Sequence, residues 1–194
     1  ASQFSKDSRY RTELYKLRRK FMSHADGLIH ADLHTSNILA SRDEMKVIDM
    51  EFAFMGPFGY DLGYLVGNLI SQYCAACFKR FPSEQNRKQF KAYLLATIKS
   101  LIETYMKTFT LCWERSVKER YRGQQGLLQS ILQEVMVDMP GYASMVNWFR
   151  SVSDIPYPDF DVIENKDAKR NATVLSLMID WGIMFGRYKY QSAD

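Results

Sequence analysis

One stretch of the sequence places two carboxylates and an amide at intervals that suit phosphoryl transfer. Asp32 follows a short apolar run, Asn37 comes five residues later, and Asp49 follows after a further twelve. A carboxylate in a loop can accept the proton of a hydroxyl nucleophile. Magnesium bound to substrate phosphates needs only one or two protein carboxylates, with neutral oxygen ligands beside them. The order of these three residues therefore predicts a base followed by a metal site.

Glu51 adds a second carboxylate to the predicted metal site. Residues i and i+2 of an extended segment point to the same side, so Asp49 and Glu51 are expected to face one site. Two carboxylates at one place repel each other unless a cation lies between them. The sequence therefore predicts Asn37, Asp49 and Glu51 as metal ligands.

The segments around these residues are predicted to be short strands on a mainly helical body. The apolar runs 28–30, 37–40 and 45–48 indicate strands, and the last two form a hairpin through the polar residues 41–44. Strands this short cannot form an independent sheet domain. The predicted fold class is therefore mainly α with a small β hairpin.

Apolar periodicity predicts the positions of the helices. They are expected over residues 4–22, 62–79, 86–110, 113–139 (one or two helices), 142–152, and from Asp161 or Asn165 to 190. Ser83 is the expected N-cap of the third helix. Pro140 and Gly141 are expected to break the chain. Two closely spaced prolines are expected to exclude regular structure from residues 155–161.

The composition is that of a globular chain with one domain. The 194 residues are 46% hydrophobic and 14% aromatic, which suffices for a core and excludes disorder. The net charge of +4 suits an anionic ligand such as a nucleotide, but no interleaving of basic and aromatic residues indicates nucleic acid. Three cysteines do not form a disulfide framework, and no apolar leader or membrane span is apparent. We therefore expect a cytoplasmic protein with neither nucleic acid nor a membrane as partner.

Two motifs carry a resemblance to a known family. The run HADLHTSN at 30–37 resembles the catalytic loop of the aminoglycoside-phosphotransferase and choline-kinase superfamily. The run IDMEFAFMGPFGYDLG at 48–63, followed by Gly67 and Asn68, closely resembles methylthioribose kinases, and a weaker match continues at 140–143 and 148–152. The resemblance implies the C-terminal helical lobe of a protein-kinase-like fold. It would be one domain over residues 1–194, with the catalytic and metal motifs in 28–68 and a substrate-binding body in 69–194.

Polar residues near Asp32 have predicted supporting roles. His30 and His34 flank it, and we interpret them as partners in orienting hydrogen bonds rather than as metal ligands. Asp61 opens a long apolar run and can act as an N-cap. In kinase-like folds the corresponding carboxylate holds the backbone of the catalytic loop, and we favour that role for Asp61.

The resemblance also implies an activity. Methylthioribose kinases use ATP and Mg²⁺ to transfer the γ-phosphoryl group to the 1-hydroxyl of 5-methylthioribose, in methionine salvage. By this likeness Asp32 is the base and contacts the acceptor, Asp49 and Glu51 hold Mg²⁺, and Arg150 is one of two substrate-binding arginines. This chain departs from the family at Phe149, which takes the place of the other arginine, and at Asn37, where a small hydroxyl residue is usual. Phe52, Phe54 and Phe58 are candidates for the lining of the sugar pocket.

Several alternatives remain open at this point. The acceptor can be choline, homoserine or an aminoglycoside, or the protein can be a non-catalytic, kinase-like binding protein. The sequence shows neither a glycine-rich phosphate loop nor a strand lysine followed by a helix glutamate. We therefore expect an N-terminal ATP-binding lobe outside these residues, and the chain by itself is expected to be inactive. A homodimer is a further alternative.

Overall fold

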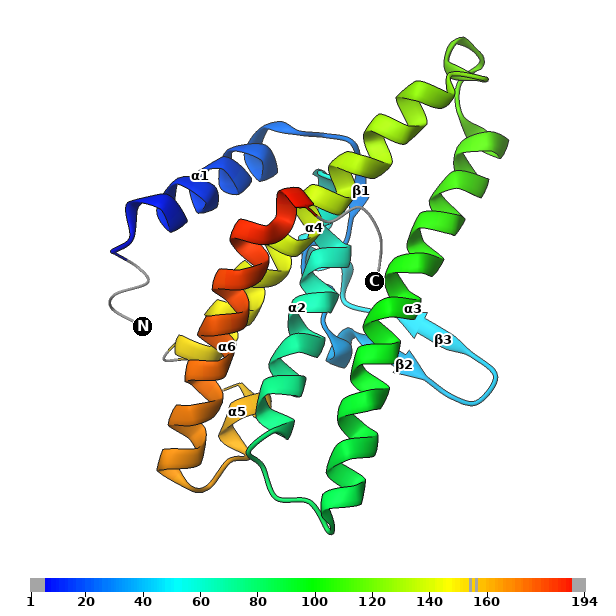
Figure 1. The fold of residues 1–194 in the computed structure, drawn as a ribbon. Coiled ribbons are helices and arrows are strands. Elements are labelled where there is room, and N and C mark those ends of the chain that lie inside the picture. The colour runs from blue at the N-terminus through cyan, green and yellow to red at the C-terminus, as the bar shows by residue number, and fades with distance from the viewer. Residues whose placement is uncertain (1–5, 154, 156, 190–194) are drawn as a thin grey trace.

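The computed structural model describes residues 6–153, 155 and 157–189, and Figure 1 shows their arrangement. The regular elements are α1 (Ser8–Ser23), β1 (Gly27–Ile29), β2 (Ile38–Ala40), β3 (Met45–Val47), β4 (Phe54–Gly56), α2 (Gly59–Ala76), α3 (Glu84–Ser116), α4 (Gln125–Val152), α5 (Pro158–Asp161) and α6 (Lys166–Gly186). Short 3₁₀ turns lie among them or after α6, at Thr35–Asn37, Met50–Phe52, Glu119–Tyr121 and Arg187–Lys189. The predicted fold class, mainly α with a small hairpin, is confirmed.

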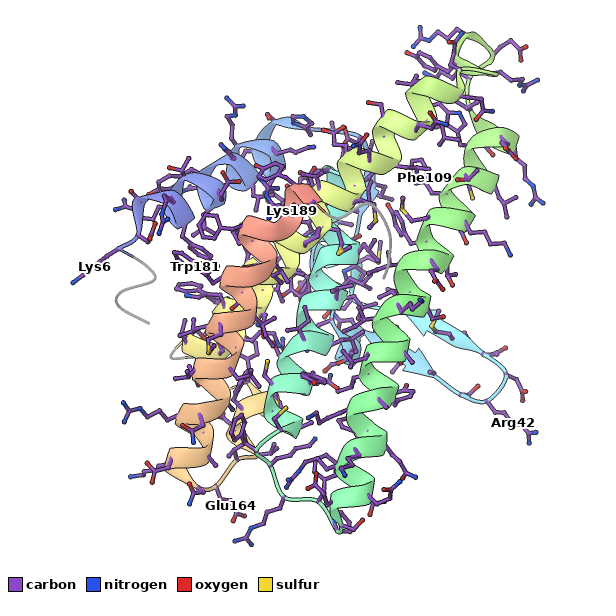
Figure 2. The ribbon with its side chains drawn as sticks, viewed as in Figure 1. Lys6, Arg42, Phe109, Glu164, Trp181 and Lys189 are labelled. Atoms are coloured by element: carbon purple, nitrogen blue, oxygen red, sulfur yellow. The ribbon has the colours of Figure 1, made fainter. Side chains whose placement is uncertain are left out.

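Two antiparallel strand pairs shape the segment that carries the predicted site. β2 pairs with β3 through Ile38 and Val47, which is the expected hairpin, and Arg42 lies at its tip, away from the body (Figure 2). β1 pairs with β4, with Ile29 opposite Phe54. The sequence did not indicate this second pairing. It closes the segment 30–53 at its base, so the predicted base and the predicted metal residues belong to one closed loop.

Helix α2 is the centre of the helical body. It packs against α3, α4 and α6, and Figure 1 shows it between α3 and α6. A Cβ atom added to Gly63 would lie 2.6 Å from the carbonyl oxygen of Met139, and one added to Gly67 would lie 2.5 Å from that of Ala143. Both glycines are therefore needed for the close approach of α2 to α4, because any side chain would collide with the α4 backbone.

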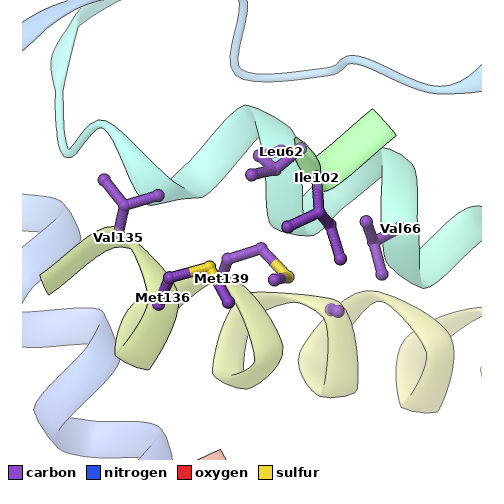
Figure 3. Packing of buried hydrophobic residues seen from close by; sticks show 7 residues of the cluster. Leu62, Val66, Ile102, Val135, Met136 and Met139 are labelled. Carbon is purple, nitrogen blue, oxygen red and sulfur yellow. The ribbon is translucent and has the colours of Figure 1, made fainter. Parts of the chain in front are cut away.

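An apolar core fills the space between α2, α3 and α4. Leu62 and Val66 on α2 meet Ile102 on α3, and α4 contributes several of the remaining buried side chains (Figure 3). The buried members of this cluster are Leu62, Val66, Ile102, Val135, Met136, Met139 and Ala143. Burial of a large aliphatic side chain contributes about 1.5–3 kcal/mol. This core therefore fixes the position of α2, which carries residues of the site.

Helix α1 lies against α4 and α6. The hydroxyl group of Tyr10 is 3.0 Å from Oγ of Ser144 in the buried interface. The ring of Trp181 on α6 (labelled in Figure 2) stacks on that of Tyr10 on α1. The two ring centroids are 6.2 Å apart. Tyr142 of α4 donates a hydrogen bond to the carbonyl oxygen of Leu17 at 3.2 Å. These contacts fix α1 beside the middle of α4.

The prediction that Pro140 and Gly141 break the chain is wrong, since both lie inside α4. Proline in a helix interior removes one hydrogen bond and costs about 3 kcal/mol. The local cost is outweighed because this part of α4 is buried against α1, α2 and α6. Gly141 allows Leu17 of α1 to pack closely against the backbone of α4, since a Cβ atom at Gly141 would lie 2.7 Å from Cδ1 of Leu17.

Several helix boundaries differ from the expected ones. α3 continues to Ser116, and α4 begins at Gln125 after Gly123, whose φ of 77° ends the connecting turn. Residues 158–161 form the short helix α5 within the expected loop, because Pro158 stands at a first helical position, where no N–H is needed.

Ser83 caps α3 as predicted, and Asn165, the second of the two alternatives, caps α6. The expected helix residues Phe4 and Tyr190, and Pro156 of the expected loop, lie outside the described residues. None of the helices that the structure describes combines the length and the apolar character that a bilayer crossing requires.

Candidate active site

The loop that contains Asp32 is held by a carboxylate on α2. Asp61 accepts hydrogen bonds from the backbone N–H of His30 at 2.6 Å and from that of Ala31 at 2.9 Å. Ala31 has a φ of 68°, a left-handed conformation that costs energy for a residue other than glycine. Asp61 therefore holds the loop in a strained conformation that places Asp32 beyond the end of β1.

The capping alternative for Asp61 is wrong, because Phe58 occupies the N-cap position of α2 and Asp61 lies two residues inside the helix. Burial raises the pKa of Asp61, and the hydrogen bonds from His30 and Ala31 oppose that rise. The carboxylate form is the one that accepts both N–H groups, so the hydrogen bonds favour the charged state.

His30 connects the Asp32 loop to the segment that carries Asp49. Its Nε2 lies 2.8 Å from the carbonyl oxygen of Ile48, and its Nδ1 lies 3.3 Å from the backbone nitrogen of Asp32. A carbonyl oxygen only accepts and a backbone N–H only donates, so the imidazole is a neutral ring with its proton on Nε2. His30 is thus an orienting residue in this arrangement and offers no free nitrogen to a metal.

The part of the loop that follows Asp32 is also held by α2. Asn68, which is fully buried, accepts hydrogen bonds from the backbone N–H of Thr35 at 3.0 Å and from its hydroxyl group at 2.8 Å. No role for Asn68 was predicted from the sequence, although Asn68 lies in the motif that resembles methylthioribose kinases. Nε2 of His34 lies 3.5 Å from Oδ2 of Asp32, so His34 stands beside the predicted base.

The predicted metal residues lie in two adjoining parts of the loop. Nδ2 of Asn37 donates to the backbone oxygen of Asp32 at 3.1 Å, and the backbone oxygen of Asn37 accepts from the N–H of Ile48 at 3.0 Å. Asn37 is thereby fixed between Asp32 and Ile48, the residue that precedes Asp49. Both Asp49 and Glu51 are exposed.

The premise of an extended segment from Asp49 to Glu51 is wrong. Asp49 has a φ of 67° in the left-handed region, and Met50–Phe52 form a 3₁₀ turn. The i, i+2 rule therefore does not place the two carboxylates on one side, and the role of Glu51 rests on the resemblance alone.

The donor set fits magnesium of the kind that bridges substrate phosphates. Within the described residues, no group of three or more His, Cys, Asp and Glu side chains is placed to hold a metal ion. Magnesium differs from zinc here, because it keeps several waters and uses one or two carboxylates together with phosphate oxygens. A carboxylate at Asp49 and an amide oxygen at Asn37 are hard oxygen ligands of this type.

A cavity of about 600 Å³ lies between α1, α2 and α4, next to the loop. Its lining residues are mainly aromatic and aliphatic: Leu14, Tyr15, Arg18, Phe21 and Met22 from α1, Tyr60 and Tyr64 from α2, and Tyr142, Met145, Val146, Trp148, Phe149 and Arg150 from α4. Phe52, Phe54 and Phe58, the candidates for the lining of the sugar pocket, are not among them. Sequence reasoning missed this set because its members come from three helices distant in sequence.

Two tyrosines connect Asp32 to the cavity. Burial, and after it the hydrogen-bonded carboxylate of Asp32, raises the pKa of Tyr64. Burial raises the pKa of Tyr60 to about 12, with smaller contributions from the charges of Asp61 and Asp32. Both phenols therefore stay protonated at neutral pH and can donate hydrogen bonds. Asp32 thus lies beside an aromatic cavity with hydroxyl donors at its edge.

Arg150 lines the cavity but is already paired. Its Nε and Nη2 lie 2.7 Å and 2.6 Å from Oδ2 of Asp159, and both side chains are about nine-tenths buried. The ring of Tyr157 covers the guanidinium at 4.4 Å. Arg150 is therefore held rigidly, and its charge is compensated within the protein.

Loss of the Asp61 carboxylate is expected to destabilise the loop. In Asp61→Ala the N–H groups of His30 and Ala31 lose their acceptor, and an unsatisfied buried donor costs about 1–3 kcal/mol. We expect the free energy of unfolding in urea to fall by about 2 kcal/mol. Asp43→Ala, at an exposed position of the β2–β3 hairpin, is the matched control. An equal loss in both variants would contradict the role given to Asp61.

Comparison with known proteins connects this geometry to a family. The phosphotransferase enzyme family matches residues 6–101. Methylthioribose kinase of Geobacillus thermodenitrificans is 37% identical over 170 residues, which cover 86% of this chain and 40% of that protein. Methylthioribose kinase of Bacillus cereus (strain B4264) is 30% identical over 188 residues, which cover 97% of this chain and 45% of that protein. The chain thus spans about two fifths of the length of the curated relatives that it matches.

Proposed function

Because the chain belongs to the phosphotransferase enzyme family and is similar to methylthioribose kinases, we propose that the protein is an ATP-dependent kinase whose acceptor is a hydroxyl group of 5-methylthioribose. This reaction would belong to methionine salvage. The proposal rests above all on one observation, the position of Asp32. The loop is held by α2 on both sides of Asp32, and through Tyr64 Asp32 borders an apolar cavity of about 600 Å³.

The residues of the loop support a proton transfer from the acceptor. Asp32 takes the proton of the acceptor hydroxyl while the oxygen of that hydroxyl forms a bond to the γ-phosphorus of ATP. The bond from that phosphorus to the bridging oxygen breaks, and ADP leaves. His30 and Asp61 contribute by holding the backbone on either side of Ala31, so that the carboxylate is oriented before the acceptor arrives. In such transfers positioning and electrostatics supply most of the catalysis.

Magnesium is the cofactor that the site fits, with Asp49 and Asn37 as proposed ligands and Glu51 as a further one. When bound with nucleotide, it would neutralise charge on the phosphates. The nucleotide and the small-molecule acceptor are the proposed partners, and we place the reaction in the cytoplasm. The part of the enzyme that grips the nucleotide is proposed to lie outside these residues, which span about two fifths of the relatives.

An acceptor panel tests the proposal. The full-length gene product is assayed by ADP release with 5-methylthioribose, choline, homoserine and an aminoglycoside, each with ATP and Mg²⁺. We expect kcat/KM to be highest for 5-methylthioribose, by tenfold or more. Preference for another acceptor would reject the proposed substrate, and turnover of none of the four would reject the proposed function.

A further inference from the structure

The charges that line the cavity are unevenly compensated. Arg18 and Arg150 are the two charged residues of its lining in the described part of the chain, and no carboxylate lines it there. Asp159 neutralises Arg150 at 2.6 Å. No Asp or Glu oxygen of residues 6–153, 155 and 157–189 lies within ion-pair distance of Arg18. The cavity therefore carries one uncompensated positive charge, on α1.

Two nearby cations of α1, Lys16 and Lys20, differ from Arg18 because each has a carboxylate partner. Lys16 pairs with Glu13 at 2.7 Å, and Lys20 pairs with Glu134 and Asp138 of α4. Glu13 in turn binds Arg187 at 2.8 Å, which ties α1 to the segment after α6. One side of α1 is thus joined to the body by ion pairs, while Arg18 faces the cavity. Arg18 is consequently held at the cavity edge by a fixed helix.

We propose that Arg18 contacts the acceptor and sets the charge preference of the cavity. A guanidinium presents several N–H donors in a planar fork, which suits two neighbouring oxygen atoms of a polyol or a carboxylate. A cationic acceptor would instead meet an uncompensated positive charge. This inference rests on the proposed function and deepens it, because it selects uncharged or anionic acceptors over choline and aminoglycosides.

The aromatic lining is the strongest argument for the opposite preference. Rings such as those of Tyr60, Tyr64 and Trp148 can attract a quaternary ammonium group. Binding of a cation also requires compensation of its charge, and the lining contains no carboxylate among the described residues, only the two arginines. Asp32, which borders the cavity through Tyr64, is the proposed base and is engaged with the acceptor hydroxyl. The balance therefore favours an acceptor without positive charge.

Arg18→Gln in the full-length gene product tests the contact, with Arg19→Gln as the matched control. Arg19 is also exposed on the same helix, but it faces a different hollow, beside Lys20 and Glu134. For 5-methylthioribose we expect KM to rise about tenfold in Arg18→Gln with kcat nearly unchanged, because a charge-assisted hydrogen bond to the bound acceptor is lost. The control should keep the KM of the wild type. An unchanged KM in Arg18→Gln, or an equal rise in both variants, would overturn the inference.

Charge reversal and binding separate this inference from the proposed function. In Arg18→Glu the ratio of choline to 5-methylthioribose binding should rise by tenfold or more. Because Trp148 lines the cavity, quenching of its fluorescence reports binding without turnover. Tight binding of 5-methylthioribose without phosphorylation would reject the kinase proposal, while its weakening in Arg18→Gln would still uphold the role of Arg18. Absence of binding by the wild type, or its preference for choline, would reject the role of Arg18.

Discussion

Asp32→Asn is expected to lower kcat for phosphoryl transfer by about 10²–10⁴-fold, the usual contribution of a positioned general base. The amide keeps the shape of the carboxylate but cannot accept the proton of the acceptor hydroxyl. KM for the acceptor should change little, because the lining of the cavity is intact. The measurement is steady-state ADP release by the full-length gene product with saturating ATP and Mg²⁺.

A fold control and a positional control accompany this variant. The thermal unfolding of Asp32→Asn should match that of the wild type, since the backbone hydrogen bond from Asp32 to His30 is retained and the amide oxygen can still accept from Tyr64. Asp43→Asn, exposed on the hairpin, should keep full activity. If Asp32→Asn retained kcat within a factor of about ten, a loss smaller than the range expected for a base, the assignment would be wrong.

Asp180→Asn is expected to change how stability depends on pH. Asp180 is fully buried on α6, where one oxygen accepts from Nδ2 of Asn147 at 2.7 Å and the other has no partner among the described residues. Burial raises its pKa to about 8, against the opposing effect of the hydrogen bond from Asn147. An unfolded aspartate has a pKa of about 4.

The sign of the effect follows from this difference in pKa. Between about pH 4 and pH 8 the folded protein holds a proton on Asp180 that the unfolded chain releases, so the free energy of unfolding falls as pH rises. One pKa unit corresponds to about 1.4 kcal/mol, so the loss across this window is of the order of a few kcal/mol. Asparagine is uncharged and of similar shape, so Asp180→Asn should remove this loss.

Urea unfolding at pH 5 and pH 8 measures the difference. The wild type should lose stability between the two pH values, and Asp180→Asn should lose about 2–4 kcal/mol less. Asp167→Asn, exposed in the first turn of the same helix, should retain the wild-type slope. Parallel slopes for Asp180→Asn and the wild type would mean that Asp180 is not the titrating group.

Local sequence patterns predicted those features of the structure whose residues interact over short distances along the chain. The hairpin of β2 and β3 and the cap at Ser83 follow from turn chemistry and polarity, whereas the supporting place of Asp61 was implied by the resemblance to kinase-like folds. The cavity did not follow, since Tyr15, Tyr64 and Trp148 meet only after three helices have packed. No periodicity in the sequence encodes such a meeting.

The failed predictions have a common physical cause in tertiary packing. Pro140 favours a break locally, but burial of α4 on several sides outweighs its intrinsic preference. Asp49 takes a left-handed backbone conformation, which the alternation of side chains along a strand does not predict. The expectation that Glu51 points to the same side as Asp49 was therefore wrong in its premise. The ion pair of Arg150 with Asp159 is equally invisible in the sequence, although the two residues stand only nine positions apart.

The two contacts that α2 makes with the loop have a mechanical consequence. Asp61 and Asn68 stand seven residues apart, which is about 10 Å along the helix axis, and each fixes one side of the turn around Asp32. A small displacement of α2 would therefore carry the whole turn with it and leave its internal hydrogen bonds unchanged. The displacement would instead alter the span between the carboxylate of Asp32 and the α4 wall of the cavity. Substitutions at the interface of α2 and α4, remote from any ligand, thus offer a way to change which acceptor reaches the base.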